Sequence, residues 1–478
     1  MKLHEYATHD ATGLAQLVNR REISPIELVQ LAREAHDRLN PTINAVVEFY
    51  DDAESVPGSD TGPFSGVPFL RKDTGPTEAG RLQECGSRLF VGNRPTVDSY
   101  FIQRARAAGL RLLGRTTTPE LGIGNSESAL CGVTRNPWNL DRTTGGSTAG
   151  SAAAVAAGIV PIASGGDGGG SIRIPASFCG LVGLNPSRGR VSGGPVRQDS
   201  SFGLARTFVL CRTVRDMAAA LDVFSGPHPG DPFIIVQPDR PYVSELSQPT
   251  GVLRIGVART RWGVVDVEPE VMRAIDSTAR LLEEMGHTVI DIDAPYEVED
   301  ILKICFGLTS LSSGSLEDSA KAMGRSLNSE TLEPVTLKLN EYGKNLPLSY
   351  FREVHEDLRI MRLRVGQSLH SFDVVVTPTM PTVAFPHGGI YNTTHPTISA
   401  EDFMRANGAL YSQVMVFNIT GQPSVSLPLA QSADGLPIGI QIVSRFGEEA
   451  TLVRVARDLE KAISWAARRP PVFPGSSE

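Results

Sequence analysis

The chain has 478 residues, of which 41% are hydrophobic and 21% are charged, and its formal net charge is −8. This mildly acidic, globular composition argues against nucleic acid or an anionic membrane as a main partner, because both carry negative charge. The length allows two or three average domains or one large α/β unit.

The N-terminus carries charges within its first five residues and lacks an apolar core, so we expect no secretory signal and a cytoplasmic location. The longest apolar run, Ala152 to Ala163, contains Gly158 and Pro161 and is too short to span a bilayer. The five cysteines are widely spaced and form no CxxC, which favours reduced, core-packed thiols over a disulfide framework or a zinc site.

The first third of the chain alternates between helical and extended patterns. Ser24, followed by Pro25 and then Glu27, predicts the start of a helix that runs toward Arg38 and ends at Asn40-Pro41. Further elements are expected as a strand at 45–49, a short buried strand at 66–70, a helix at 97–108 and a strand at 110–113. Such βα alternation is typical of a sheet covered by helices.

The middle of the chain repeats this pattern. We expect a small-residue helix at 148–157, a strand at 159–163 and a helix at 214–224. Six prolines between Gly226 and Thr250 predict a connection without regular structure. A strand at 253–258, a helix at 269–285 and a strand at 288–292 would follow it.

Residues 297–372 show helices without strand alternation, separated by Gly314, Gly324 and Gly343. We expect the substrate-facing wall in this part, at residues 297–345. The remaining elements are predicted as strands at 372–378, 424–427 and 437–443 and a closing helix at 451–463. The fold class is therefore α/β, as a single large domain over residues 1–478 in which a central mixed sheet, built from both ends of the chain, is covered by helices on both faces.

The run from Thr143 to Ala176 holds nine glycines and four serines but only one acid and one base. Backbone this free of side chains suits close approach to a ligand, because glycine leaves its N–H unshielded. Two serines follow glycines, Ser147 after Gly145-Gly146 and Ser171 after Gly168-Gly169-Gly170. A phosphate cradle is the rival interpretation, but the run contains neither GxxxxGK[ST] nor GxGxxG.

A serine nucleophile needs a base to take its proton. Neither serine lies in a G-x-S-x-G turn and no histidine lies in an obvious partner motif, which weakens a Ser-His-Asp triad without excluding it. Lys72, at the end of an apolar strand, is the best candidate, since burial can lower the pKa of a lysine toward neutrality. A solvated lysine at a strand end is the alternative.

Three blocks of sequence resemble the signature of the amidase signature family. They are Gly66-Val67-Pro68-Phe69-Leu70-Arg71-Lys72-Asp73, then Gly145-Gly146-Ser147, then Gly169-Gly170-Ser171-Ile172-Arg173-Ile174-Pro175-Ala176. The resemblance covers most of the chain and departs from the usual pattern at Thr148-Ala149, where the family has Ser-Gly. Ala466 to Pro470 and the overall pattern are similar to members that act on man-made linkages, such as nylon-type cyclic oligoamides or urethanes.

The resemblance implies a role for each residue of these blocks. Ser171 would be the nucleophile, Ser147 a bridging serine preceded by a cis peptide, and Lys72 the base. The backbone N–H groups of Gly168, Gly169, Gly170 and Ser171 would form the oxyanion hole, and no metal or cofactor would be required. Asp167 and Arg173 are expected to form a supporting ion pair around the nucleophile loop, and Asn125 and Cys305 to line the substrate pocket.

These expectations describe a hydrolase that cleaves the C–N bond of a neutral small-molecule amide or carbamate and that exists as a monomer or homodimer. Two alternatives stay open. The resemblance extends to the glutaminase subunit of a tRNA-dependent amidotransferase, which needs partner subunits. A non-catalytic binding protein with this fold is the other, although Lys72, Ser147 and Ser171 are all present.

Overall fold

The computed structural model describes residues 1–59, 61–260 and 262–475. Its centre is an 11-stranded mixed sheet, ordered β1-β3-β2-β8-β10-β9-β14-β15-β13-β11-β12. The strands of this sheet are β1 (Val46–Phe49), β2 (Pro68–Lys72), β3 (Arg111–Thr116), β8 (Ile162–Asp167), β9 (Val182–Asn185), β10 (Arg206–Cys211), β11 (Arg254–Val257), β12 (Thr288–Asp291), β13 (Val374–Pro378), β14 (Ser424–Gln431) and β15 (Pro437–Ser444). Strands from both ends of the chain meet in one sheet, so the predicted α/β class is confirmed.

Parallel pairing occurs near both edges of the sheet, and antiparallel pairing fills its middle. β2 is parallel to β3 and β8, and β11 is parallel to β12 and β13. From β8 to β13 each neighbouring pair is antiparallel. Two small ribbons lie outside this sheet, β4 (Glu127–Ser128) with β5 (Gly132–Val133) and β6 (Arg135–Asn136) with β7 (Asn139–Thr143).

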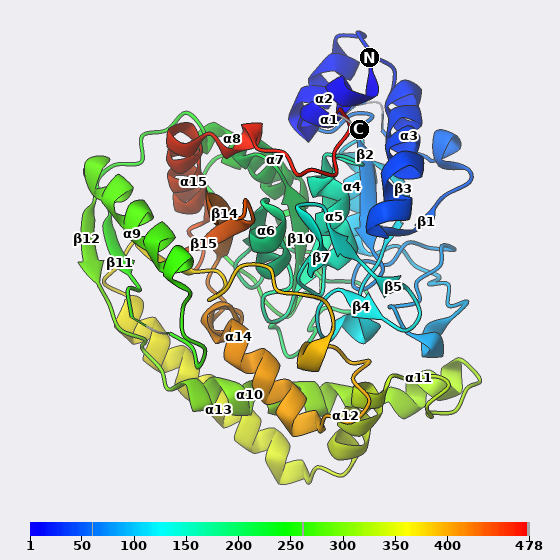
Figure 1. The fold of residues 1–478 in the computed structure, drawn as a ribbon, viewed down its shortest axis with the longest axis vertical. Helices are drawn as coiled ribbons and strands as arrows, with labels where there is room; N and C mark the ends of the chain where they lie inside the picture. Colours follow the sequence, from blue (N-terminus) through cyan, green and yellow to red (C-terminus); the bar gives the residue numbers. More distant parts are fainter. Residues whose placement is uncertain (60, 261, 476–478) are drawn as a thin grey trace.

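Helices cover both faces of the sheet (Figure 1). α5 (Ala149–Ala156) and α6 (Arg173–Cys179) pack together on one face, whereas α7 (Val214–Phe224) and α15 (Glu449–Ile463) pack together against the other. The remaining helices around the sheet are α1 (Leu3–Thr8), α2 (Ala11–Asn19), α3 (Pro25–Ile43), α4 (Tyr100–Ala107), α8 (Tyr242–Glu245) and α9 (Pro269–Glu284).

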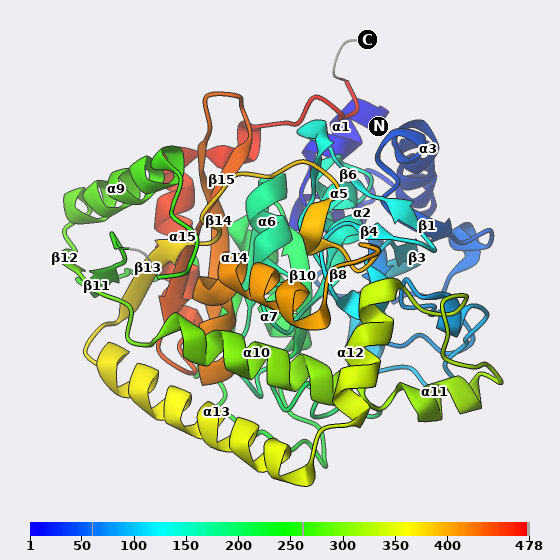
Figure 2. The ribbon, with the colours of Figure 1, turned by 60° about the horizontal axis from the view of Figure 1, so that its bottom comes forward.

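A second helical layer forms an outer wall at the bottom of Figures 1 and 2. It consists of α10 (Val298–Ser313), α11 (Leu316–Ala322), α12 (Pro334–Lys344), α13 (Leu348–Leu369) and α14 (Ala400–Thr420). The apolar side chains between these helices form a core separate from that of the sheet, with Ile304, Leu339, Leu358 and Phe403 among its buried members. This wall therefore has a stabilising core of its own beside the sheet.

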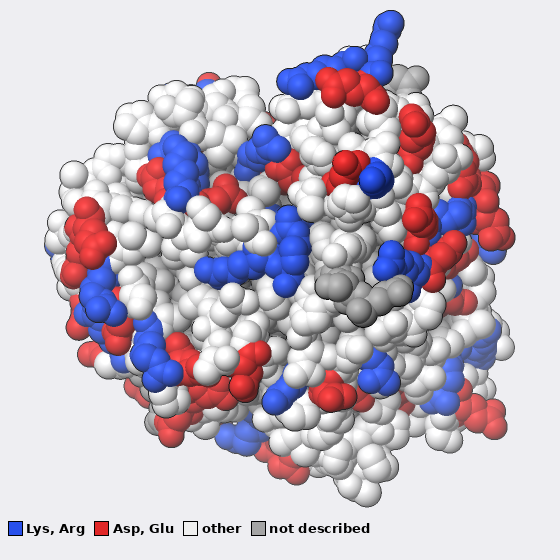
Figure 3. All heavy atoms as spheres, turned by 45° about the horizontal axis from the view of Figure 1, so that its top comes forward, with Lys and Arg blue, Asp and Glu red and all other residues white. Residues whose placement is uncertain are grey.

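Charges on the surface are mixed. On the face drawn in Figure 3, acidic and basic side chains are interspersed.

Within the described residues, no helix is both long enough and apolar enough to cross a bilayer. All five cysteines fall within this part of the chain and are free of disulfides, and four of them are buried.

Several predicted element boundaries were wrong for identifiable reasons. α3 continues past Pro41 to Ile43, because a proline in the last turn removes little of the helical ladder. The strand expected at 159–163 is β8, which begins only after Pro161 and extends to Asp167 through pairing with β10. The proline-rich connection contains one helical turn, α8.

Gly343 was expected to separate two helices, and it lies in the last turn of α12, one residue before this helix ends. A Cβ at this position would come within 1.9 Å of the Ser310 carbonyl oxygen on α10. The glycine therefore also permits a close helix crossing at the end of α12. The sequence patterns also gave no indication of α6 or α14. α14 is buried on most sides, including at polar residues such as Gln413 and Asn418, so it lacks an amphipathic stripe.

Candidate active site

Lys72 ends β2 with its side chain buried and only 2% exposed. Its Nζ donates to Ser147 Oγ at 2.8 Å and approaches the Gly166 carbonyl oxygen at 3.4 Å. Its backbone N–H donates to Ser164 Oγ on β8, which fixes the strand end. Burial lowers the pKa of Lys72 to about 7, although the negative charge of Asp167 acts in the opposite direction. A large fraction of this amine is therefore uncharged near neutral pH.

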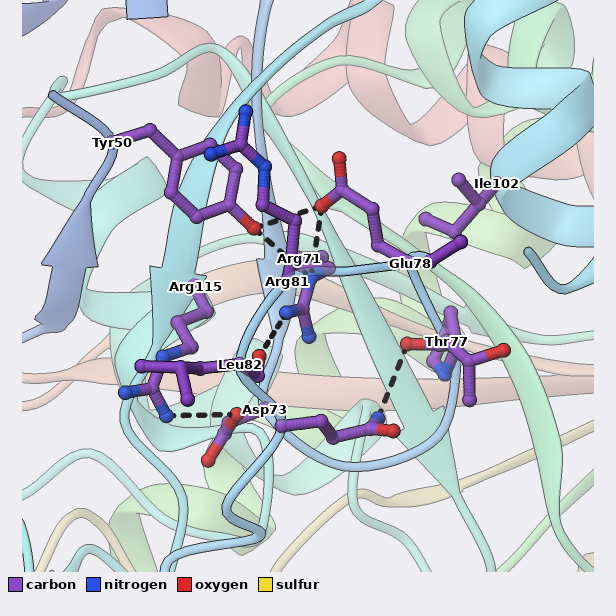
Figure 4. Close-up of polar contacts among 12 residues, drawn as sticks. Tyr50, Arg71, Asp73, Thr77, Glu78, Arg81, Leu82, Ile102 and Arg115 are labelled. Carbon is purple, nitrogen blue, oxygen red and sulfur yellow. Dashed lines mark hydrogen bonds and ion pairs between the residues drawn. The ribbon is translucent and has the colours of Figure 1, made fainter. Parts of the chain in front are cut away.

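The residues before and after Lys72 in the chain, Arg71 on β2 and Asp73 just after it, form buried ion pairs (Figure 4). Side chains alternate along a strand, so Arg71 and Asp73 lie on the side opposite Lys72. Arg71 Nε pairs with Glu78 Oε2 at 3.1 Å, and Asp73 Oδ1 pairs with Arg115 Nη1 at 3.2 Å. These ion pairs hold the backbone on both sides of the amine, which limits the positions that the amine can reach.

Ser147 follows a cis peptide bond from Gly146, as the resemblance implied. Its carbonyl oxygen accepts a hydrogen bond from Thr118 Oγ1 at 3.0 Å. Gly122 packs against the serine, and a Cβ at Gly122 would lie 3.3 Å from Ser147 Oγ. The segment from Thr118 to Gly122 therefore lies against Ser147.

The loop that carries Ser171 connects β8 to α6, and the carboxylate of Asp167 organises it. This carboxylate accepts hydrogen bonds from the N–H groups of Gly170 at 2.7 Å and of Ile172 at 3.2 Å. Gly170 therefore cannot donate to an oxyanion in this conformation, and its inclusion among the expected oxyanion donors was wrong. Within the described residues, the N–H groups of Gly168, Gly169 and Ser171 have no acceptor. These three N–H groups are therefore available to bind an oxyanion.

Asp167 and Arg173 form a completely buried ion pair, with Asp167 Oδ1 2.9 Å from Arg173 Nη2. Burial would raise the pKa of the Asp167 carboxyl, but the guanidinium and the hydrogen bonds from Arg173, Asn418 and Gly170 outweigh it and hold this pKa below its usual range. Arg173 Nη1 also donates to Gln441 Oε1 at 2.7 Å. Both groups therefore remain ionised, and the Asp167 carboxylate, held by Arg173, stabilises the serine loop through the hydrogen bonds that it accepts.

Asn418 on α14 has a role that the sequence did not reveal. Its Nδ2 donates to both the carbonyl oxygen and the carboxylate of Asp167, and its Oδ1 accepts from Arg173. No sequence periodicity connects Asn418 with a loop 251 positions earlier. Only the fold brings α14 against the serine loop.

A cavity of about 760 Å³ opens over these groups and is lined by Lys72, Ser147 and Ser171. Asn125 and Cys305 also line it. The Asn125 amide donates to the Tyr391 carbonyl oxygen at 3.1 Å, and Cys305 is buried within α10. Helices α10 and α11, which fall within the expected 297–345 wall, contribute Leu308, Ser312 and Leu316 to the lining, and α14 contributes Met404, Tyr411 and Met415.

Two buried carboxyl groups, of Glu120 and Glu333, connect the site to the helical wall. Glu120 lies two positions before Gly122, and its Oε2 accepts the backbone N–H of Glu333 at 2.9 Å, just before α12. Its Oε1 accepts from Ser87 Oγ at 2.8 Å. Burial, together with the charge of Glu333, raises the pKa of Glu120 to about 7. No local sequence signal distinguishes these glutamates from exposed ones.

Comparison with known proteins places this geometry in a family. The sequence profile of the Amidase family matches residues 27–453. The chain is 37% identical over 480 residues to 6-aminohexanoate-cyclic-dimer hydrolase of Pseudomonas sp. (strain NK87), covering 97% of each chain. A solved structure of 6-aminohexanoate cyclic dimer hydrolase superposes with a TM-score of 0.90 at 36% identity, covering 98% of this chain and 99% of the other. A bacterial aryl acylamidase of the amidase signature family superposes with a TM-score of 0.85 at 26% identity, covering 97% and 99%.

Proposed function

The chain belongs to the amidase signature family, a family of hydrolases that act on C–N bonds, and from this premise we propose that it cleaves a small, neutral amide or carbamate through an acyl-enzyme on Ser171. One observation carries the proposal. A buried amine with a pKa of about 7 lies 2.8 Å from the hydroxyl of Ser147, in a cavity that Ser171 also lines.

The first half of the reaction transfers two protons. Uncharged Lys72 takes the proton of Ser147 while Ser147 takes the proton of Ser171, and Ser171 Oγ then attacks the carbonyl carbon. The oxyanion that forms is stabilised by the N–H groups of Gly168, Gly169 and Ser171, which need no reorganisation to receive it.

The same relay then works in reverse. The proton held by Lys72 returns through Ser147 to the departing nitrogen as the C–N bond breaks, which leaves the acyl group on Ser171. Water attacks this ester, the relay accepts a proton from the water, and Ser171 leaves with its proton restored. Lys72 thus acts in turn as base and acid, for which a pKa near the working pH is well suited.

The cavity and the relatives support a small substrate. A volume of about 760 Å³ lies within the usual range for small-molecule sites. The relatives are named for 6-aminohexanoate cyclic dimer and for aryl acylamides, in which an apolar body surrounds the scissile amide. A carbamate presents the same carbonyl and nitrogen, so aryl carbamates belong in the proposal.

Removal of the reacting groups tests the assignment directly. The isolated protein should release 4-nitroaniline from a simple 4-nitroanilide and an amine from 6-aminohexanoate cyclic dimer or an aryl carbamate. Ser171→Ala should abolish turnover, and Lys72→Ala should lower kcat/KM by a factor of about 10² to 10⁴ at pH 7.5.

Ser247→Ala and Lys461→Ala are matched controls, because both residues are exposed and lie outside the cavity lining. Both controls should retain wild-type turnover. Near-normal turnover by Lys72→Ala would eliminate the relay. Activity on glutamine only after addition of partner subunits would instead indicate the amidotransferase glutaminase.

A further inference from the structure

The connection between β9 and β10 covers one side of the cavity. We call residues 192–203 the strap. Its residues 196–201 all line the cavity that contains Lys72 and Ser171. The strap leads directly into β10, which pairs with β8 at the base of the serine loop. A group on the strap can therefore contact a substrate whose amide lies over Ser171.

The backbone of the strap is held in an uncommon conformation. Ser201, Phe202 and Gly203 have successive φ values of 50°, 56° and 75°, although only the last is a glycine. The N–H of Leu204 donates to Ser201 O, and the Phe202 ring contacts the ring of Phe351 on α13 at a centroid distance of 5.7 Å. A bulky residue with positive φ persists only where its surroundings fix it, and such positions cluster at ligand sites.

The cavity has two chemically different sides. Among the described residues, the helical side presents apolar and uncharged polar groups and no charged side chain; the apolar groups come from residues Cys305, Leu308, Leu316, Met404 and Met415, and the polar ones include Thr309, Ser312 and Asn407. The strap presents polar and charged groups, from residues Arg197, Gln198, Asp199 and Ser200. A substrate that fills both sides needs an apolar body and a polar or ionic group at one end.

Arg197 is the cation on the strap and has no counter-ion. Within the described residues, its guanidinium forms no ion pair and no hydrogen bond. Its charge opposes the rise in pKa that burial causes at the Cys85 thiol, so the guanidinium lies within electrostatic range of that cavity-lining residue. The carboxylate of Asp199 instead lies within electrostatic range of Arg188 and Arg362, where its charge opposes the fall in pKa that burial causes at both guanidinium groups.

We propose that Arg197 is a specificity residue that binds a carboxylate at the end of the substrate remote from the scissile amide. This inference rests on the proposed function and changes one part of it: the scissile amide is neutral, but amides of amino carboxylic acids or dicarboxylic acids, which carry a remote carboxylate, are preferred over uncharged analogues. A guanidinium pairs with a carboxylate through two parallel hydrogen bonds, which gives direction as well as affinity. Hydrolysis of any cyclic oligoamide also yields a linear molecule with such a carboxylate.

Two substrate pairs test the proposal, one for each side of the amide. Glutaryl-4-nitroanilide is compared with pentanoyl-4-nitroanilide, which places the carboxylate on the acyl side. N-acetyl-6-aminohexanoate is compared with N-acetylhexylamine, which places it on the amine side. In at least one pair, wild-type protein should show a higher kcat/KM for the acid, mainly through a lower KM, and added salt should reduce this preference.

Arg197→Ala should reduce the acid-to-neutral ratio of kcat/KM by about two- to fivefold, which is the effect expected from the loss of one ion pair at an exposed side chain. Arg197→Lys should retain part of the preference. Arg280→Ala is the matched control, because Arg280 is an exposed arginine of α9 outside the cavity lining.

The possible failures are distinguishable. An unchanged ratio in Arg197→Ala, or the absence of any acid preference in wild-type protein that hydrolyses the neutral members, would overturn the role of Arg197 alone. If none of the four compounds is hydrolysed and Ser171→Ala behaves like wild type on every amide tested, the proposed function itself fails, and this inference fails with it.

Discussion

At the scale of the residue, the properties of Lys72 depend on its surroundings. The side chain is almost completely buried, so the charged ammonium loses most of its hydration. The carboxylate of Asp167 partly compensates for this loss and keeps the pKa near 7. The Ser147 hydroxyl at 2.8 Å then gives the uncharged amine a proton donor.

The pKa of Lys72 predicts the pH dependence of turnover. The base is active only when uncharged, so kcat/KM should rise with pH, pass its midpoint at about pH 7 and reach a plateau above pH 8. Below the midpoint, kcat/KM should fall about tenfold per pH unit, as for a single titrating group. A neutral anilide measured from pH 5 to 9 avoids titration of the substrate. A profile that is flat between pH 5 and 8, or that falls with rising pH, would contradict the assignment.

Oxyanion binding also depends on individual backbone groups. The N–H of Gly170 donates to Asp167, so this hydrogen bond stabilises the conformation of the loop and the N–H is not available to an oxyanion. The three remaining N–H groups come from Gly168, Gly169 and Ser171, which all line the cavity. A residue pattern alone cannot separate the structural donor from the catalytic ones.

At the scale of the element, the contact between Glu120 and Glu333 joins the segment over Ser147 to the start of α12. Gly122 packs against Ser147, and Glu120 accepts the N–H of Glu333. Glu333 Oε1 in turn accepts the N–H of Ala129 at 2.6 Å. Two buried carboxyls share this junction, and the pKa of each is raised, mainly by burial.

This junction predicts a pH-dependent contribution to stability. The folded-state pKa of Glu120 is about 7, above its ordinary value of 4.5, so between these pH values the folded state binds more protons than the unfolded state. Rising pH therefore favours unfolding, by a total on the order of 3 kcal/mol above pH 7. Glu120→Gln removes this titration, so its melting temperature relative to wild type should increase from pH 5 to pH 8.

Thermal unfolding of both proteins at matched pH values measures the difference. Glu330→Gln serves as the control, because Glu330 is an exposed glutamate close to Glu333 and should track wild type at every pH. A difference between Glu120→Gln and wild type that stays constant with pH would show that Glu120 remains ionised in the folded protein.

At the scale of the whole molecule, the sheet and the helical wall have separate cores. The sheet core includes buried residues from α1 to the C-terminal segment, whereas the wall core comes mainly from α10 to α14. α11 buries only Leu316 and Ala320, while every residue of β2 is buried. Substrate would therefore contact a rigid sheet edge on one side and a less tightly packed wall on the other.

This difference predicts uneven hydrogen exchange. Backbone amides of residues 300–345 should exchange faster than those of β2 and β8, because fewer buried contacts must open to expose them. Exchange followed by mass spectrometry at peptide resolution tests this prediction. Equally strong protection across the wall and the sheet would contradict it.

Most of the α/β organisation could be predicted from the sequence because its signals are local. Apolar periodicity, Ser24 with Pro25, and the glycine-rich run each act over a few neighbouring residues, and they correctly predicted α7, α9 and the strand leading to Lys72. α14 could not be predicted, because burial on most sides leaves no periodic contrast. The end of α3 was placed too early because the effect of Pro41 depends on its position in the last turn of the helix.

By itself, the sequence determined which chemical groups are available: an amine at position 72, hydroxyls at 147 and 171, and backbone free of side chains between 168 and 170. The tertiary structure decided how those groups behave. Burial lowers the pKa of the amine, Asp167 accepts a hydrogen bond from one of the N–H groups, and α14 approaches the loop from a distant part of the chain. Proton affinity and hydrogen-bond partnership depend on distance and solvation, and these are properties of the folded chain that spacing along the sequence does not encode.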